Sequence, residues 1–129
     1  MISDPIGDML SRIRNGFLAS RREVTVPYSK VKENLAEILL RNGYFKKVEI
    51  VGENKKSFKF TLRYEAKKPT LTKIERVSKP GRRVYIKAGQ IRPVLSGLGM
   101  MVLSTPMGLM TGRQAQKKNL GGEIICRIW

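Results

Sequence analysis

The apolar residues of the first 66 positions follow two different spacings, and this change of period restricts the possible fold more than any other feature of the chain. Helical spacing, with an apolar residue at every third or fourth position, runs from Ile6 to Phe17 and again from Val31 to Leu39. Strict alternation, typical of a half-buried strand, runs from Phe58 to Tyr64. Residues 23–26 and 44–51 have the composition of short strands. The sequence therefore predicts the order α-β-α-β-β for residues 1–66.

Local signals set the ends of the two predicted helices. Asp4 followed by Pro5 is a favourable start for the first helix, and Ser29 can cap the second. Gly43 supplies a left-handed stop for that second helix. Its buried face is predicted to consist of Val31, Leu35, Ile38 and Leu39.

The second half contains more glycine and proline, which predicts short strands and only brief helices. Strands are expected at residues 72–77, 82–86, 100–103 and 123–129, with a turn at 78–81. The segment 88–99 carries three glycines and a proline, so it is limited to a short helical turn. Thr111 and Gln114 form a capping-box pair for a short helix that ends near Lys118.

Residues 66–70 are polar, basic and contain a proline, as is typical of a domain boundary. We predict two small domains: an N-terminal α/β domain at residues 1–66 and a C-terminal, mostly β domain with short helices at residues 67–129. The fold class is α/β in the broad sense, of the α+β type.

The net charge restricts the kind of partner. Lys and Arg number 26 against 10 Asp and Glu, which gives a net charge of +16 and a pI near 10.5. Residues 1–66 carry +5 of this charge and residues 67–129 carry +11. A chain so basic repels itself unless a polyanion screens it, which favours nucleic acid as the partner. The rival, an anionic membrane surface, would require a basic amphipathic helix, and none is evident. The main contact surface is therefore expected in the C-terminal half.

The residues needed for catalysis are scarce. The chain has no histidine, a single cysteine and no Gly-Lys-Ser/Thr loop for a nucleotide. Its carboxylates are scattered, and the close pair Asp4 and Asp8 suits the positive end of a helix dipole. We expect no enzymatic activity, no catalytic residue, no metal site and no cofactor. The lone Cys126 favours a reducing compartment, and the N-terminal residues resemble neither a signal nor a transit peptide.

Three features of the basic half are candidates for RNA contact. The segment Ser104–Gly108 places two hydroxyls and a glycine in one loop, which suits contact with ribose hydroxyls and base edges. The same pattern is also typical of an ordinary turn between strands. Tyr85 is predicted to point away from its neighbours, where it could stack on a base or simply lie at a sheet edge. Glu123 is isolated among basic residues. It either accepts from a base amino group, orients a loop hydroxyl or is a solvated surface carboxylate.

Basic side chains near these features would supply phosphate contacts. They include Arg82, Arg83, Arg113 and Lys118.

Several motifs resemble those of the eighth protein of the bacterial small ribosomal subunit. They are the stretch Ser104–Thr111, the Gly-Gly-Glu-Ile-Ile-Cys run at 121–126 and the terminal Trp129. The opening residues 3–6 and the segments 12–15, 26–30 and 43–44 also resemble that family. The resemblance covers the whole chain.

The resemblance implies two small α/β domains and no catalysis. It implies direct binding to the central domain of 16S rRNA early in assembly, organisation of the platform, and contact with neighbouring small-subunit proteins. In many bacteria such proteins also repress translation of their own operon by binding a similar structure in its mRNA.

The resemblance also implies roles for particular positions. Ser104, Thr105 and Gly108 would meet an RNA helix, with Tyr85, Gly122 and Glu123 on the same face. In the first domain, Arg14 and Lys30 would contact a second rRNA helix. The family loop reads Ser-Thr-Ser-Lys-Gly, so Pro106 and Met107 depart from it, although both remain candidate contacts. The family's aspartate is Gly112 here, so the following helix is expected to rely on Thr111 alone for its cap.

The competing interpretation is a general RNA chaperone or a protein that compacts nucleic acid, with a membrane-surface carrier more remote. The distinctive residues argue against it, because they are hydroxyl, glycine and glutamate residues in loops rather than a stripe of lysine. We expect a protein that is monomeric when free, is not associated with membranes and is located on the ribosome in the cytoplasm. The stroma of an organelle remains an alternative location.

Overall fold

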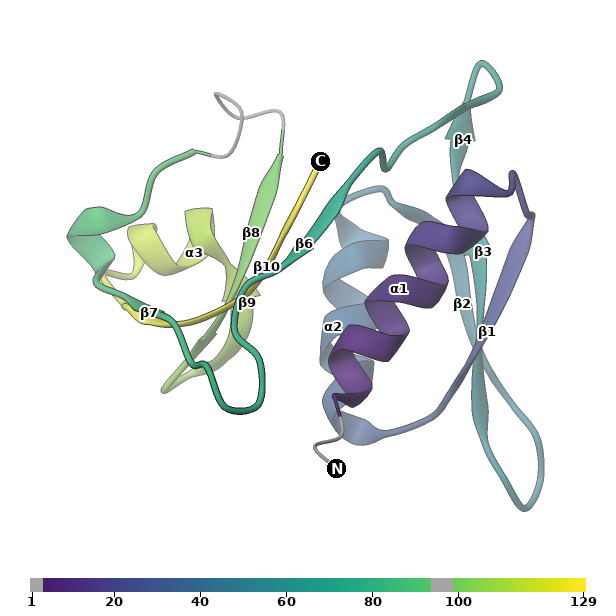
Figure 1. Ribbon diagram of the computed structural model, residues 1–129, viewed down its shortest axis with the longest axis horizontal. Helices are drawn as coiled ribbons and strands as arrows, with labels where there is room; N and C mark the ends of the chain where they lie inside the picture. Colours follow the sequence, from purple (N-terminus) through teal and green to yellow (C-terminus); the bar gives the residue numbers. More distant parts are fainter. Residues whose placement is uncertain (1–3, 94–98) are drawn as a thin grey trace. The chain divides into compact units, whose positions relative to one another are not determined.

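A computed structural model of the chain describes residues 4–93 and 99–129. Two compact units are present: Asp8–Thr72, and Lys73–Trp129 together with Met1–Gly7. Each is described by itself (Figure 1). Helices and antiparallel sheets are both present, which confirms the predicted α+β class. The division into domains at 1–66 and 67–129 stays a prediction.

The unit Asp8–Thr72 is built on a three-stranded antiparallel sheet with two helices on one face (Figure 1). Its elements are α1 (Pro5–Leu18), β1 (Glu23–Pro27), α2 (Lys30–Arg41), β2 (Phe45–Val51) and β3 (Ser57–Leu62), with strand order β1-β3-β2. The alternating side chains Phe58, Phe60 and Leu62 of β3 are buried. The predicted order α-β-α-β-β is therefore confirmed.

Helix α1 packs closely enough on the sheet to require a glycine. Met9, Leu10, Ile13 and Phe17 form its buried face, as the spacing predicted. A Cβ placed on Gly16 would lie 2.4 Å from Cγ2 of Val24. The absent side chain thus sets how near α1 lies to β1.

The phase of α2 differs from the prediction at its first turn. Val31 was expected in the core, but it is 63% exposed, whereas Lys32 is 6% exposed. Ser29 caps the helix by accepting from the Lys32 N–H, and helical spacing places position 32 on the same face as Leu35, Ala36 and Leu39. The aliphatic stem of Lys32 is buried, and its Nζ donates to the carbonyl of Pro27 at 3.1 Å.

The segment predicted as a boundary forms a tight hairpin. Strand β4 (Tyr64–Glu65) pairs with β5 (Lys68–Pro69) across a two-residue turn. The turn residues Ala66 and Lys67 have φ values of 51° and 65°, although neither residue type favours the left-handed region. The alternating strand therefore ends at Leu62, and Tyr64 belongs to the hairpin.

The second unit has a five-stranded antiparallel sheet centred on β10, with short helices, as predicted (Figure 1). Its elements are β6 (Ile74–Arg76), β7 (Tyr85–Ile86), the 3-10 helix η1 (Ala88–Gln90), β8 (Met100–Thr105), β9 (Gly108–Thr111), α3 (Gly112–Lys117) and β10 (Gly122–Ile128). The order is β6-β10-β8-β9, and β7 also pairs with β10.

Two predicted strands of this unit are shorter than expected, and one strand was missed. Within the predicted strands 72–77 and 82–86, only β6 and β7 are paired. They share one edge of β10, where β6 pairs with residues 126–128 and β7 with residues 122–123, so neither strand can extend along the whole edge. Strand β9 was not predicted, since its four residues follow the turn directly. Of the predicted helical turn at 88–99, residues 94–98 lie outside the described residues.

The predicted capping box of α3 is confirmed. Thr111 Oγ1 accepts from the Gln114 N–H, and Gln114 Oε1 accepts from the Thr111 N–H. Both side chains cap the helix, so the expectation that Thr111 would act alone is wrong. The core next to α3 consists of Ile91, Met101, Leu103, Met110, Ala115 and Ile124.

Cys126 is a free, fully buried thiol in β10. Burial raises its pKa to about 12, so the thiolate form is absent at neutral pH. Within the described part of the chain, no helix has the length and apolarity needed to cross a membrane.

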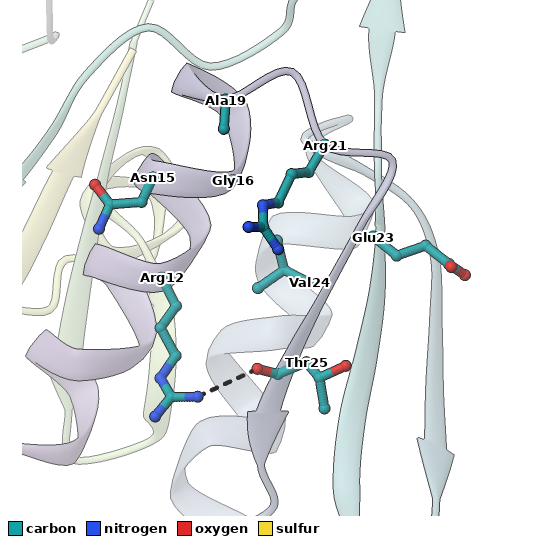
Figure 2. Close-up of a pocket in the computed structure, with 8 residues that line it drawn as sticks. All are labelled: Arg12, Asn15, Gly16, Ala19, Arg21, Glu23, Val24 and Thr25. Atoms are coloured by element: carbon teal, nitrogen blue, oxygen red, sulfur yellow. Dashed lines mark hydrogen bonds between the residues drawn. The ribbon is translucent and has the colours of Figure 1, made fainter.

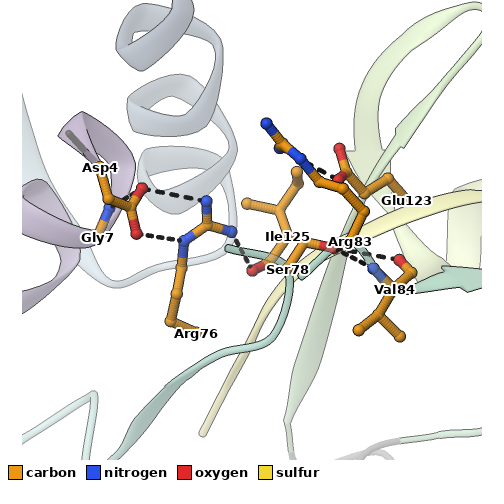
Figure 3. A network of polar contacts seen from close by, with 8 residues as sticks. All are labelled: Asp4, Gly7, Arg76, Ser78, Arg83, Val84, Glu123 and Ile125. Atoms are coloured by element: carbon orange, nitrogen blue, oxygen red, sulfur yellow. Dashed lines mark hydrogen bonds and ion pairs between the residues drawn. The ribbon is translucent and has the colours of Figure 1, made fainter. Parts of the chain in front are cut away.

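Asp4 caps α1 and also forms an ion pair (Figure 3). Its carboxylate accepts from the Gly7 N–H at 3.1 Å and from Arg76 Nη2 at 3.2 Å. Arg76 in turn donates to the carbonyl of Ile125 at 2.8 Å. Partial burial works against ionisation, but the hydrogen bonds from Arg76 and Gly7 outweigh it and lower the pKa of Asp4.

Replacing Asp4 with asparagine should separate the charge from the cap, because asparagine also caps helices well. We expect Asp4→Asn to lower the free energy of unfolding at neutral pH by roughly 1–2 kcal/mol, the scale of a charged hydrogen bond. The folded pKa is lowered, so this contribution is complete above the ordinary value of 3.8 and is lost as the pH falls through the folded value. Urea denaturation between neutral and acid pH measures it. A difference between the two proteins that stays constant with pH would contradict this account.

Candidate nucleic-acid interface

Three predicted contact residues lie in one row across the second sheet. The register pairs Glu123 of β10 with Tyr85 of β7 on one side and with Ser104 of β8 on the other. Directly opposed residues of antiparallel strands project from the same face. Tyr85 is 70% exposed, whereas its neighbours Val84 and Ile86 pack on the core. The predicted outward orientation of Tyr85 is therefore confirmed.

The turn between β8 and β9 is held by hydrogen bonds among its own residues. Thr105 is buried, and its hydroxyl donates to the carbonyl of Gly108 at 2.9 Å and accepts from the Met107 N–H at 3.2 Å. Gly108 has a φ of 109°, a region that essentially only glycine occupies, and the space beside its Cα is open. Thr105 and Gly108 thus shape the turn, and the half-buried Ser104 lies just before it in the row with Glu123 and Tyr85.

Pro106 and Met107, the departures from the family loop, fit this turn without disturbing it. The described non-glycine residues with positive φ are Ser20, Ala66, Lys67 and Asn119, so Pro106 and Met107 both keep negative φ. The N–H that fixes the turn belongs to Met107, not to Pro106. Both residues are exposed, and the Met107 side chain is 67% exposed at the tip.

Positions 121 and 122 require glycine because the backbone of neighbouring segments approaches them closely. A Cβ on Gly122 would lie 2.2 Å from the Ser104 carbonyl oxygen, and one on Gly121 would lie 2.5 Å from the Ile86 carbonyl oxygen. Packing between strands, rather than room for a ligand, therefore accounts for both glycines. Contact of Gly122 with RNA stays a prediction.

Glu123 has a partner that the sequence did not reveal. Its Oε2 accepts from Arg83 Nη1 at 3.2 Å, and its side chain is only 16% exposed (Figure 3). A solvated surface carboxylate, one of the alternatives, does not describe this geometry. Nor does a bond to the turn hydroxyl of Thr105, which serves Gly108 and Met107 instead.

The other predicted phosphate contacts lie on separate elements of the same unit. Arg82 closes the turn with Lys79 through paired backbone hydrogen bonds of 2.9 Å. Arg113 lies in the first turn of α3, and Lys118 is its C-cap. All three side chains are exposed and stand on short, hydrogen-bonded segments.

The unit Asp8–Thr72 carries the two remaining candidates. Arg14 is exposed on α1 and borders a cavity of about 80 Å³ with Leu18 and Leu71. Lys30 is exposed at the first position of α2. The structure does not bring these two candidates into one pocket.

A larger hollow of about 500 Å³ lies between α1 and β1 (Figure 2). Its lining comprises Arg12, Asn15, Gly16, Ala19, Arg21, Glu23, Val24 and Thr25. Arg12 pairs with Asp8 and donates to the Thr25 carbonyl at 3.5 Å. Sequence reasoning placed Arg12 only outside the apolar face, and helical spacing alone could not indicate the hollow.

The glycine contacts generate a stability prediction. Gly122→Ala should lower the free energy of unfolding by about 2 kcal/mol or more, because its Cβ would meet backbone that cannot rotate away. Gly89→Ala is the matched control, since no atom lies within 4 Å of its Cβ position. Denaturant titration of both variants measures the difference. Equal stability of the two would show that β8 and β10 can separate at little cost.

Comparison with known proteins agrees with the motifs on this sheet. Residues 4–129 match the family described as Ribosomal protein S8. Small ribosomal subunit protein uS8 of Nitratidesulfovibrio vulgaris (strain DP4) is 50% identical, with all of both chains covered. The protein of that name from Dictyoglomus turgidum is 47% identical, over 99% of this chain and 98% of its own. The one from Solibacter usitatus is 48% identical over the whole of both chains. The chain therefore belongs to the ribosomal protein S8 family.

Proposed function

We propose that this protein is a structural constituent of the small ribosomal subunit that binds the central domain of 16S rRNA directly. The observation that carries the proposal is the row Tyr85–Glu123–Ser104, an aromatic and a hydroxyl side chain on one face of the sheet. It lies in the part of the chain with a net charge of +11, residues 67–129. Exposed aromatic residues stack on bases, hydroxyls bond ribose and base edges, and cations bind phosphates.

The relatives support the location. Their name places them in the small ribosomal subunit, so we propose that this chain also functions there, on the ribosome in the cytoplasm, among neighbouring subunit proteins. Its role is to bind and organise RNA of the platform rather than to catalyse a reaction. The free protein is monomeric in this proposal.

The two parts of the chain divide the work. Residues 67–129 make the main contact, through Ser104, Tyr85 and the exposed cations. Residues 1–66 add a second rRNA contact near Arg14 and Lys30, both exposed on their helices. Thr105 and Gly108 contribute chiefly by holding the turn, and their backbone remains close to the proposed RNA.

The same surface supports a regulatory role. An mRNA segment that folds like the rRNA site would meet the same row of side chains. We therefore extend the proposal to translational repression of the protein's own operon, through competition between that mRNA and rRNA for one surface.

Preference among RNAs is the direct test. A fragment of the 16S rRNA central domain should bind roughly a hundredfold or more tightly than a random duplex of equal length, because specific affinities exceed non-specific ones by at least that factor. Titration at one fixed salt concentration measures both. Equal affinity for the two RNAs would favour the competing chaperone or compacting function.

Charge and hydroxyl variants should fail in different ways. Arg82→Gln or Lys118→Gln should flatten the slope of log K against log salt by roughly one unit or less, with preference among RNAs nearly unchanged. Ser104→Ala should reduce the preference and hardly change the slope. Titrations across a salt series measure both quantities. If all three variants behave alike, this division between charge and hydroxyl is wrong.

A further inference from the structure

Arg83 and Glu123 come from different segments of the chain and meet beside the row formed by Tyr85, Glu123 and Ser104. Glu123 lies in β10, opposite Tyr85 and Ser104. Arg83 precedes β7 and, two positions from Tyr85, reaches the same side. The ion pair joins a side chain that is 51% exposed to one that is 16% exposed. The carboxylate therefore lies deeper than the guanidinium, which faces outward.

The backbone beside Arg83 is fixed by a buried hydroxyl. Ser78 is 0% exposed, and its Oγ accepts from the Val84 N–H at 2.9 Å and donates to the Val84 carbonyl at 3.1 Å (Figure 3). The Val84 carbonyl also accepts from the Ile124 N–H at 2.9 Å. The main chain at residue 84 is thus tied both to the turn and to β10, so Arg83 starts from a rigid base.

A guanidinium fixed in this way keeps most of its binding capacity. It has five N–H donors in a planar fork, and the described bond to Glu123 uses one of them. An arginine that is already ordered loses less side-chain entropy when it binds. The cost is a negative charge near RNA, but that charge is largely covered and is already paired.

We infer that Glu123 is a positioning residue for Arg83: its carboxylate holds the guanidinium in place on the Tyr85–Ser104 face to bind an RNA phosphate or base edge. The inference rests on the proposed function, because it assumes that RNA meets this face. It differs from direct base recognition by Glu123, in which Arg83 would be incidental. It also differs from simple repulsion, in which removing the carboxylate would strengthen binding.

A double-mutant cycle on the full-length protein separates the three accounts. The probe is the 16S central-domain fragment, and the variants are Glu123→Gln, Arg83→Gln and the double variant. We expect each single variant to bind about tenfold more weakly, the scale of one charge-assisted contact. The double variant should bind no more weakly than Arg83→Gln alone. A further loss in the double variant, or equal or tighter binding by Glu123→Gln, would overturn the inference.

Glu75→Gln is the matched control. Glu75 pairs with Arg127 at 2.7 Å, at the other end of β10, so this variant removes the same charge and also frees an arginine. Its binding should be equal to or slightly tighter than that of the wild type. Thermal melts of all variants separate weaker binding from loss of fold. A tenfold loss in Glu75→Gln would show that the effect is general to the sheet.

A measurement without RNA tests the positioning independently of the proposed function. Side-chain NMR relaxation at Arg83 Nε should show an ordered guanidinium in the wild type and a mobile one in Glu123→Gln. Equal mobility in both proteins would overturn the inference even if the RNA preference is as proposed. Conversely, an ordered Arg83 in a protein with no RNA preference would leave the positioning intact and contradict the proposed function.

Discussion

The second unit depends on β10, which pairs with other strands on both of its edges. It pairs with β8 on one edge and with β6 and β7 in succession on the other. The strand pairs can close only because Gly122 lets the Ser104 carbonyl lie where a Cβ would otherwise be. This contact also sets which residues share a row, since Ser104, Glu123 and Tyr85 align through it. The close approach of β8 to β10 therefore both requires glycine at position 122 and places Ser104 beside Glu123 in the candidate interface.

The few carboxylates of this unit all form ion pairs with arginines. Among residues 4–7, 73–93 and 99–129, the acidic residues are Asp4, Glu75 and Glu123, and each pairs with an arginine. The three carboxylates are thus not isolated in the basic half of the chain, because each accepts from a guanidinium of the same unit.

Features set by nearby residues could be predicted, and those set by strand register could not. The capping box of α3 and the orientation of Tyr85 need only a few adjacent residues, and both were predicted. The Arg83–Glu123 pair joins positions 40 apart and depends on the pairing of β7 with β10, in which Tyr85 lies opposite Glu123. Spacing gives the period of a helix but not its phase, so the burial of Lys32 in place of Val31 also escaped prediction.

Several polar side chains in and beside the candidate interface form hydrogen bonds within the protein itself. The Thr105 hydroxyl holds its turn, the Ser78 hydroxyl holds Val84, and the Glu123 carboxylate holds Arg83. Such internal bonds leave fewer conformations to be lost if this face binds a ligand, which lowers the entropic cost of binding. The side chains of Pro106 and Met107 take no part in the hydrogen bonds of the turn. The turn depends on Thr105 and Gly108, and neither replaced side chain is needed to hold it.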